Sequence, residues 1–419
     1  MIRLMARLWV SLLLIAYATP ILIAAAGELP VRLEDFVAQA LVGNLDLQAA
    51  EHRLHSVRVQ ATEAGLLDDP AFMVRRETPA SNLFSTDALW LGLSRTFPGA
   101  GKRAWARLAA QIEIDMEVVA VEEVRRRVIT TARAAWLDLV AADAIASIQQ
   151  EQIALARAML DVAQNQFAAG AGDQQGVLRA QIDLLERTND LATTQQERKG
   201  VEARVNTLMK RSPESLGGSS LGAPEMPVIA EITASLAELQ EMADATAVQA
   251  ARLAIEHHAN QIEAAALARR PDFSVEAGLM YMADAPDLTM LSLSIPLPWA
   301  NRARYTAQRD AARILKMHAE SAYQAAQAAT RLAIGERHIE WEAARRTFRL
   351  YDVALLPILR QGVEVATNGN ATGTLDRAAV IAAQAELHEA QRTRLRALIS
   401  ANKAADALSE IVGHSVVGN

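Results

Sequence analysis

The stretch from Leu93 to Gln111 has a spacing of glycine and lysine that could bind a phosphate group. It reads LSRTFPGAGKRAWARLAAQ, with alternating apolar residues before the glycines and a helical pattern after them. A P-loop needs a glycine five positions before its Gly-Lys pair and a Ser or Thr directly after it. Thr96 and Arg103 occupy those two positions. The sequence therefore predicts a turn from a strand into a helix, and no nucleotide site.

Two histidine clusters have a spacing that could bind a metal ion. His52 and His55 lie three residues apart in a predicted helix, and Glu256, His257 and His258 lie in a helix of the second half. Histidines on one helix face can serve as metal ligands. Neither cluster supplies a complete ligand set, and the chain has no cysteine. We interpret these residues as surface histidines, and we expect no cofactor, no metal site and no catalytic residues.

The composition predicts long helices packed closely together. Hydrophobic residues make up 51% of the chain, yet only 4% of the residues are aromatic, and alanine is abundant. Alanine with Glu, Gln and Arg favours long helices over a large globular core. The net charge is -7, whereas nucleic-acid-binding proteins usually carry a positively charged surface. We therefore expect no nucleic-acid partner.

The N-terminus has the pattern of a secretory signal peptide. Arg3 and Arg7 precede an apolar run that ends at Ile23, and three alanines at 24–26 form a small-residue cleavage site. We expect residues 1–26 to be removed. No later segment reaches the ~20 continuous apolar residues of a membrane-spanning helix.

The remaining chain contains two similar sequence repeats, offset by about two hundred residues. A helical stretch ends in DDPAF near residue 72, and a similar one ends in RRPDF at residue 273. Each is followed by two strand-like segments, a very long helix, a glycine-containing turn and a returning helix. We expect the long helices at Lys102–Ala169 and Ala300–Asn368, and the returning helices at Val177–Arg211 and Leu375–Ile411. Helices this long are typical of a coiled coil or helical barrel. The predicted division is a first repeat at 27–211, a linker at 212–230 and a second repeat at 231–419.

The strand-like segments alternate between apolar and small or polar residues. In the first repeat Leu89, Leu91, Leu93 and Phe97 oppose Trp90, Gly92, Ser94 and Thr96, and in the second Leu291, Leu293, Ile295 and Leu297 oppose Ser292 and Ser294. This pattern fits a membrane β-barrel and also a half-buried soluble sheet. Four strands cannot close a barrel, and open edges are not tolerated in lipid. Three copies would supply twelve strands, so we favour a membrane barrel shared by a trimer.

The ordered set of motifs resembles the TolC-type outer-membrane efflux channels. The resemblance rests on DDPAF and RRPDF, on TFPGAGKR and SIPLPWANRAR, and on the turns FAAGAGDQQGVLRAQ and NGNATGTLDRAA. The GKR variant is most similar to the heavy-metal subgroup, of the CzcC and CusC type. Many relatives carry an acylated N-terminal cysteine, which this chain lacks.

The resemblance implies a mainly α fold with a small β part. Long antiparallel coiled-coil helices would form a trimeric α-barrel through the periplasm of a Gram-negative bacterium, and four strands per chain would complete a twelve-stranded β-barrel in outer-membrane lipid. A homotrimer would dock onto a periplasmic adaptor (membrane fusion) protein and an inner-membrane resistance-nodulation-division pump. The docking tip would contain Phe167, Gly170, Gly172, Asp173, Val177, Leu178, Gly369, Thr374, Leu375 and Asp376. The strand-to-helix turns at the membrane interface would contain Pro98, Gly99, Gly101, Lys102, Arg103, Pro298, Trp299 and Arg302.

The expected function is a passive exit duct from the periplasm to the outside, carrying heavy-metal cations. Asp173 in the first tip turn and Asp376 just beyond the second would form acidic rings under threefold symmetry, and such rings select cations. They could equally be ordinary helix-end aspartates. Two alternatives to the metal duct are an outer-membrane duct for drugs or organic solvents and a periplasmic coiled-coil adaptor or structural protein. Lys102 and Arg103 are assigned to the lipid headgroups.

Overall fold

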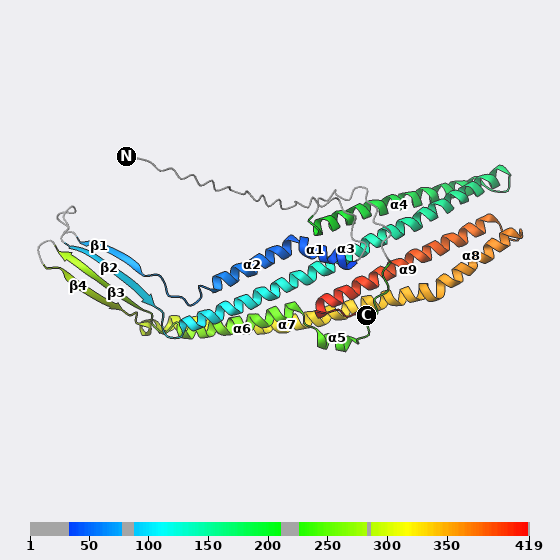
Figure 1. The fold of residues 1–419 in the computed structure, drawn as a ribbon. Coiled ribbons are helices and arrows are strands. Elements are labelled where there is room, and N and C mark those ends of the chain that lie inside the picture. Colours follow the sequence, from blue (N-terminus) through cyan, green and yellow to red (C-terminus); the bar gives the residue numbers. More distant parts are fainter. Residues whose placement is uncertain (1–32, 78–87, 211–225, 283–285, 418–419) are drawn as a thin grey trace, which may run out of the picture.

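The chain forms an elongated molecule with a β-sheet at one end and two helical hairpins at the other (Figure 1). The computed structural model describes residues 33–77, 88–210, 226–282 and 286–417. The predicted signal peptide lies outside these residues, as does most of the predicted linker.

The first half runs from two short helices through two strands into a long helical hairpin. The elements are α1 (Leu33–Gly43), α2 (Leu45–Ala61), β1 (Ala71–Glu77), β2 (Ala88–Phe97), α3 (Lys102–Ala168) and α4 (Gln174–Leu208). Helix α3 has 67 residues. It continues without a break because no glycine or proline interrupts its sequence, as the sequence analysis predicted.

The second half repeats this order. Its elements are α5 (Leu236–Met242), α6 (Thr246–Leu267), β3 (Phe273–Met282), β4 (Leu288–Ser294), the short 3-10 helix η1 (Pro298–Asn301), α7 (Arg302–Arg349), the π-helical turn η2 (Leu350–Leu355), α8 (Leu356–Ala371) and α9 (Arg377–Val412). The strand predicted from the sequence was too long at its C-terminal end. Strand β4 ends at Ser294, so Ile295 and Leu297 lie beyond it. The proline-containing sequence IPLP explains the early end, because proline has no N–H to donate to a ladder.

Pro357 is accommodated by a change in helix type. A proline removes one helical hydrogen bond, and its ring clashes with the carbonyl group four residues earlier. The wider π turn η2 lies directly before α8, in which proline is near the first position. Gly335, by contrast, lies inside α7 without breaking it.

Short helices pack against the middle of the long hairpins, where large side chains of both are buried. Phe36 of α1 packs against Trp136 of α3, with 5.7 Å between ring centroids. On the other hairpin Trp341 is buried with Leu239 of α5 and donates from Nε1 to the Ala230 carbonyl oxygen at 2.9 Å. Alanines fill much of the remaining core, which lets the long helices approach closely.

Ion pairs connect α3 of the first half to α9 of the second. Arg133 contacts Asp406 at 2.7 Å, Asp138 pairs with Lys403, and Glu151 lies 3.2 Å from His388. The residue numbers rise along α3 and fall along α9, which is the register of an antiparallel helix pair. Burial raises the pKa of Asp406, and the hydrogen bond and charge of Arg133 oppose this increase.

All four strands form one antiparallel sheet in the order β1-β2-β3-β4. The two halves meet where β2 pairs with β3, from Ala88 opposite Met282 to Phe97 opposite Phe273. The rings of Phe97 and Phe273 stack with their centroids 5.1 Å apart. The two predicted hairpins are therefore fused into one sheet.

Two glycines make room for the indole of Trp90 on one face of this sheet. Gly92 and Gly278 are direct partners across β2 and β3, and Trp90 is only 1% exposed. A Cβ on Gly278 would lie 2.9 Å from Trp90 Cε2, and a Cβ on Gly92 would overlap the same ring. The glycines are needed because the largest side chain of the face lies flat over them.

We predict that Gly92→Ala destabilises the protein by about 1–3 kcal/mol, the usual cost of overpacking. The thermal unfolding midpoint in detergent should fall, and adding Trp90→Leu should recover part of the loss. Gly335→Ala is the control, because a Cβ there meets nothing within 4 Å. It should stabilise α7 slightly. Equal midpoints for Gly92→Ala and the unsubstituted protein would contradict the close packing.

Candidate channel surfaces

The sheet has one apolar face and one mixed face. Register partners share a face, so the mainly apolar one carries the exposed side chains of Phe72, Val74, Leu93, Phe273, Leu279, Tyr281, Leu291 and Leu293. Arg76, Arg95 and Thr289 also lie on this face. The opposite face carries Arg75, Trp90, Ser94, Thr96, Ser274, Glu276, Ser292 and Ser294 with four methionines. The predicted alternation is confirmed for β2 and for Leu291 to Ser294 of β4.

Both outer strands of the sheet leave one edge without a partner among the described residues. Strand β1 pairs only with β2, and β4 pairs only with β3. Such edges present unpaired N–H and C=O groups that bind another strand readily. The sheet therefore has both an uncovered apolar face and two edges suited to pairing with further copies.

The turn between β2 and α3 is stabilised by a carboxylate from the second half. Asp272 Oδ1 accepts hydrogen bonds from the Gly99 N–H and from Lys102 Nζ, both at 2.7 Å. Gly101 has a φ of 91°, a left-handed conformation that favours glycine. Pro98, Gly99 and Gly101 thus redirect the chain from the strand into the helix, and Asp272 holds the first turn of that helix.

The cations of the GKR motif have partners within the chain. Lys102 binds Asp272, and Arg103 donates from Nε to the Gly65 carbonyl oxygen at 2.7 Å. The sequence analysis assigned Lys102 and Arg103 to lipid headgroups and did not identify Asp272. No local pattern in the sequence places Asp272 beside this turn, because the contact depends on the pairing of β2 with β3.

The corresponding turn of the second half is built differently. Pro298 begins η1, and the exposed Arg302 begins α7. Trp299 lies within η1. The residue that matches Asp272 in the first Pro-x-Phe motif is Ala71, which has no carboxylate. The two strand-to-helix turns are therefore not equivalent.

The Lys102 and Gly99 contacts change the acidity of Asp272. Partial burial acts to raise the pKa of Asp272, but hydrogen bonds from Lys102 and the Gly99 N–H outweigh it, and the pKa lies below its ordinary value. A carboxyl group with a lowered pKa in the folded state contributes stability above its unfolded pKa. That contribution is lost as the pH falls through the lowered value.

We predict that Asp272→Asn lowers the thermal unfolding midpoint at neutral pH, because it removes the ion pair with Lys102. The difference from the unsubstituted protein should shrink as the pH falls below the ordinary range of aspartate. Asp287→Asn is a control, since Asp287 is exposed beyond the other end of the sheet. A difference that stays constant down to the lowest pH would exclude this role of the Asp272 charge.

The first tip turn lies between α3 and α4 and contains the predicted residues. Gly170 has a φ of 70°, and Asp173 caps α4 by accepting a hydrogen bond from the Gly176 N–H at 2.8 Å. Phe167 and Leu178 are exposed on either side of the turn, and Gly172 and Val177 lie between them.

The second tip turn, between α8 and α9, has the same capping arrangement. Asp376 accepts from the Ala379 N–H at 2.9 Å, and Thr374 Oγ1 donates to the Gly369 carbonyl oxygen at 3.0 Å. Leu375 packs against Gly369. The left-handed residue is Gly373, with a φ of 73°, and the sequence analysis did not select it. The structure thus brings each predicted tip set together within its own turn.

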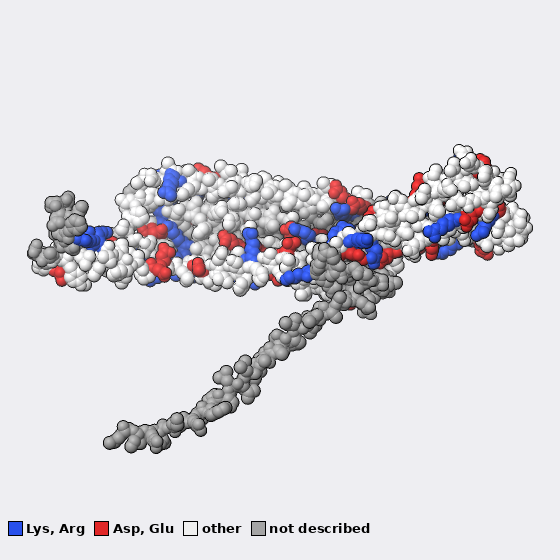
Figure 2. Space-filling model, turned by 90° about the horizontal axis from the view of Figure 1, so that it is seen from above, with Lys and Arg blue, Asp and Glu red and all other residues white. Residues whose placement is uncertain are grey.

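The histidine clusters do not form a metal site in the part of the chain that the structure describes. No group there contains three or more His, Asp or Glu side chains placed to hold a metal ion. His257 and His258 instead each share a hydrogen bond with Gln261. On the face shown in Figure 2, acidic and basic side chains are interspersed along the helices.

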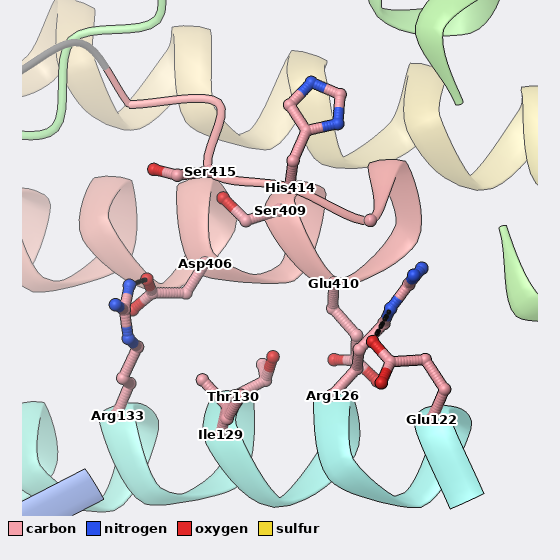
Figure 3. A pocket seen from close by; sticks show the side chains of 11 residues that line it. Glu122, Arg126, Ile129, Thr130, Arg133, Asp406, Ser409, Glu410, His414 and Ser415 are labelled. Atoms are coloured by element: carbon pink, nitrogen blue, oxygen red, sulfur yellow. Dashed lines mark hydrogen bonds and ion pairs between the residues drawn. The ribbon is translucent and has the colours of Figure 1, made fainter. Parts of the chain in front are cut away.

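A pocket lies between α3 and the C-terminal end of α9 (Figure 3). Arg133 and Asp406 face each other across it, and Arg126 donates to Glu122 at 2.9 Å and to the Asp244 carbonyl oxygen at 2.9 Å. These charges are paired within the chain, and the pairs join α3 to α9 and to the loop before α6. We therefore regard the pocket as a structural junction.

Comparison with known proteins agrees with this architecture. Residues 36–209 match the family model described as outer membrane efflux protein. Over these residues the chain is similar to outer membrane efflux proteins. The match spans α1 to α4, and the likeness to solved structures of this fold extends over both halves.

Three solved structures illustrate the likeness. A crystal structure of CusC has 15% sequence identity and a TM-score of 0.73, over 92% of this chain and 93% of that one. The outer membrane protein VceC from Vibrio cholerae has 18% identity and a TM-score of 0.74, over 92% and 96%. The MtrE outer membrane channel from Neisseria gonorrhoeae, in its open state, has 17% identity and a TM-score of 0.72, over 92% and 90%.

These similarities show a shared fold. A comparison with curated protein sequences finds no match. Among the described residues, no helix is both long and apolar enough to cross a membrane.

Proposed function

We propose that the chain is the outer-membrane channel of a tripartite exporter, a passive exit duct from the periplasm to the outside. The observation that carries this proposal is the sheet, with an exposed apolar face, a mixed face and two open edges. A membrane strand needs an apolar face toward lipid, and it must have every backbone group paired. Three copies joined edge to edge would satisfy both requirements with twelve strands.

The helical part supports the same assembly. Exposed apolar side chains recur along α7 and η2 at Leu332, Ile339 and Val353, seven residues apart or a multiple of seven. On α4, Ile182 and Leu185 are also exposed. Heptad spacing of this kind is typical of helices that pack against a further helix. In the proposed trimer these stripes meet neighbouring copies, and the long helices enclose a periplasmic tunnel.

The proposed partners follow from the family. The exposed tip turns dock a periplasmic adaptor protein, and a proton-driven inner-membrane pump supplies the energy. Residues 27–211 and 231–419 are two copies of one structural repeat, joined by a linker at 212–230.

The proposed cargo is a heavy-metal cation, supported by the GKR motif and by the likeness to CusC. A duct for drugs or organic solvents is the alternative, because the fold is shared equally with other outer-membrane proteins and does not itself select a metal.

The apolar face is tested by placing a charge on it. We predict that Leu291→Arg, at a position 76% exposed in the single chain, costs about 2–4 kcal/mol if the side chain meets the lipid midplane. Membrane fractionation should then show less detergent-dependent trimer in the outer membrane. Val42→Arg is the matched control, because Val42 is 78% exposed on α1, away from the sheet. Equal trimer yields for the two variants would refute a lipid-facing sheet.

The acidic tip is tested by removing charge without removing the helix cap. Asparagine caps a helix as well as aspartate, so Asp173→Asn keeps the bond to the Gly176 N–H. We predict a lower preference for cations over anions in planar-bilayer conductance, with an unchanged unfolding midpoint. Asp46→Asn is the control, since Asp46 lies on α2, far from the tip. Unchanged selectivity in Asp173→Asn would show that Asp173 caps the helix and does not select cations.

A further inference from the structure

A second pocket lies where α9 passes between α3 and α7, and it has room for a small molecule. Its volume is about 430 Å³, which falls within the usual range of ligand pockets. Residues of α3, α7 and α9 line it. The pocket therefore exists only where the two halves of the chain meet.

The floor of this pocket is apolar. Ile399 of α9 is buried in a cluster with Leu137 and Leu395, and Ala141 and Ile145 of α3 pack against that cluster. Ile399, Ala141 and Ile145 all line the pocket. A ligand with an apolar body would be stabilised there, because its contact with the floor removes apolar surface from water.

The rim of the pocket is charged, and one of its cations has no partner. Lys403 of α9 pairs with Asp138 of α3. Arg337 pairs with Glu340, both on α7, at 2.7 Å. Arg396 of α9 is exposed, and its side chain forms no ion pair or hydrogen bond within the part of the chain that the structure describes. The two ion pairs cancel, so the pocket carries the positive charge of Arg396.

The pocket opens on the side of the helical hairpins opposite to α1 and α5. Successive residues of an α-helix lie about 100° apart around its axis, so residues two apart point in nearly opposite directions. Trp136 of α3 packs against α1, and Asp138 follows it by two residues. On α9, Ala405 is buried in a cluster with Leu239 of α5, and Lys403 precedes it by two residues. In the proposed trimer α1 and α5 would obstruct the duct if they lay inside it, so the pocket faces the tunnel.

We propose that this pocket binds small organic anions with an apolar body, such as aromatic carboxylates. The guanidinium of Arg396 presents N–H donors in a planar fork that matches a carboxylate, and the hydroxyl of Ser400 lies one turn further along α9 on the same rim. The apolar body lies over Ile399 and Ile145. The inference rests on the proposed function for the place of the pocket on the tunnel wall, whereas the pocket itself is contained in one chain. Such a site suits the duct for organic compounds, the alternative cargo.

The test is calorimetric titration of the full chain, purified in a non-ionic detergent, with 1-naphthoate. The neutral 1-naphthalenemethanol has the same rings without the charge and is titrated in parallel. Naphthoate should bind about tenfold more tightly than the alcohol, because hydrogen bonds to a charged group contribute about that factor to affinity. Arg396→Gln should abolish this difference. Arg396→Lys keeps the charge, so it should bind naphthoate more tightly than Arg396→Gln does.

The matched control is Arg309→Gln. Arg309 is also exposed on a long helix, α7, and it too forms no ion pair with another described residue. This variant should bind naphthoate as the unsubstituted protein does. Three results would each overturn the site: no naphthoate binding, equal binding of naphthoate and the alcohol, or unchanged naphthoate binding in Arg396→Gln.

Sizing in detergent and bilayer conductance of the same preparations test the proposed function separately. A conducting trimer without Arg396-dependent naphthoate binding refutes only this site. Arg396-dependent binding by a chain that forms no trimer refutes only the channel, and the pocket then lies on an open surface of a single chain.

Discussion

The pairing of β2 with β3 is the contact on which the rest of the architecture depends. Each half alone supplies only a two-stranded hairpin, and an isolated hairpin is marginally stable in water. Joining the hairpins produces a four-stranded sheet and places Asp272 of one half against the turn that begins α3 of the other. The direction in which the longest helix leaves the sheet is therefore set by a residue 170 positions away from Lys102. The ion pairs between α3 and α9 continue this contact between the two halves along the helices.

The sequence predicts the architecture well because its signals are long and repeated. The absence of Gly and Pro from 102 to 168 fixes the extent of α3, and strict alternation fixes the faces of β2. Contacts between the halves are different, since nothing local in the sequence indicates that Asp272 meets Lys102. The same holds for Gly92 and Gly278, whose shared purpose appears only when Trp90 is seen lying over both. The π turn before Pro357 was likewise missed, because a proline predicts a break or kink without specifying its form.

The residues of the candidate surfaces show the same difference between local sequence signals and long-range contacts. Asp173 and Asp376 lie where one long helix turns back into the next, and each caps the helix that follows. Their contribution to ion selectivity depends on further copies of the chain and stays a prediction. The composition of the mixed face was not recognised from sequence, because its residues come from both halves. Only the register of the complete sheet places them on one side.

The fusion of the two hairpins also governs the order in which the protein can fold. Thr96 and Ser274, which hydrogen-bond across β2 and β3, are separated by 178 residues. Contacts of such long sequence separation form slowly, because a large loop must close before any stabilising contact is gained. During synthesis the first hairpin is therefore complete long before its partner strand exists, and its apolar side chains and open edge are exposed throughout that interval. Such a chain requires protection from aggregation on its way to its final site.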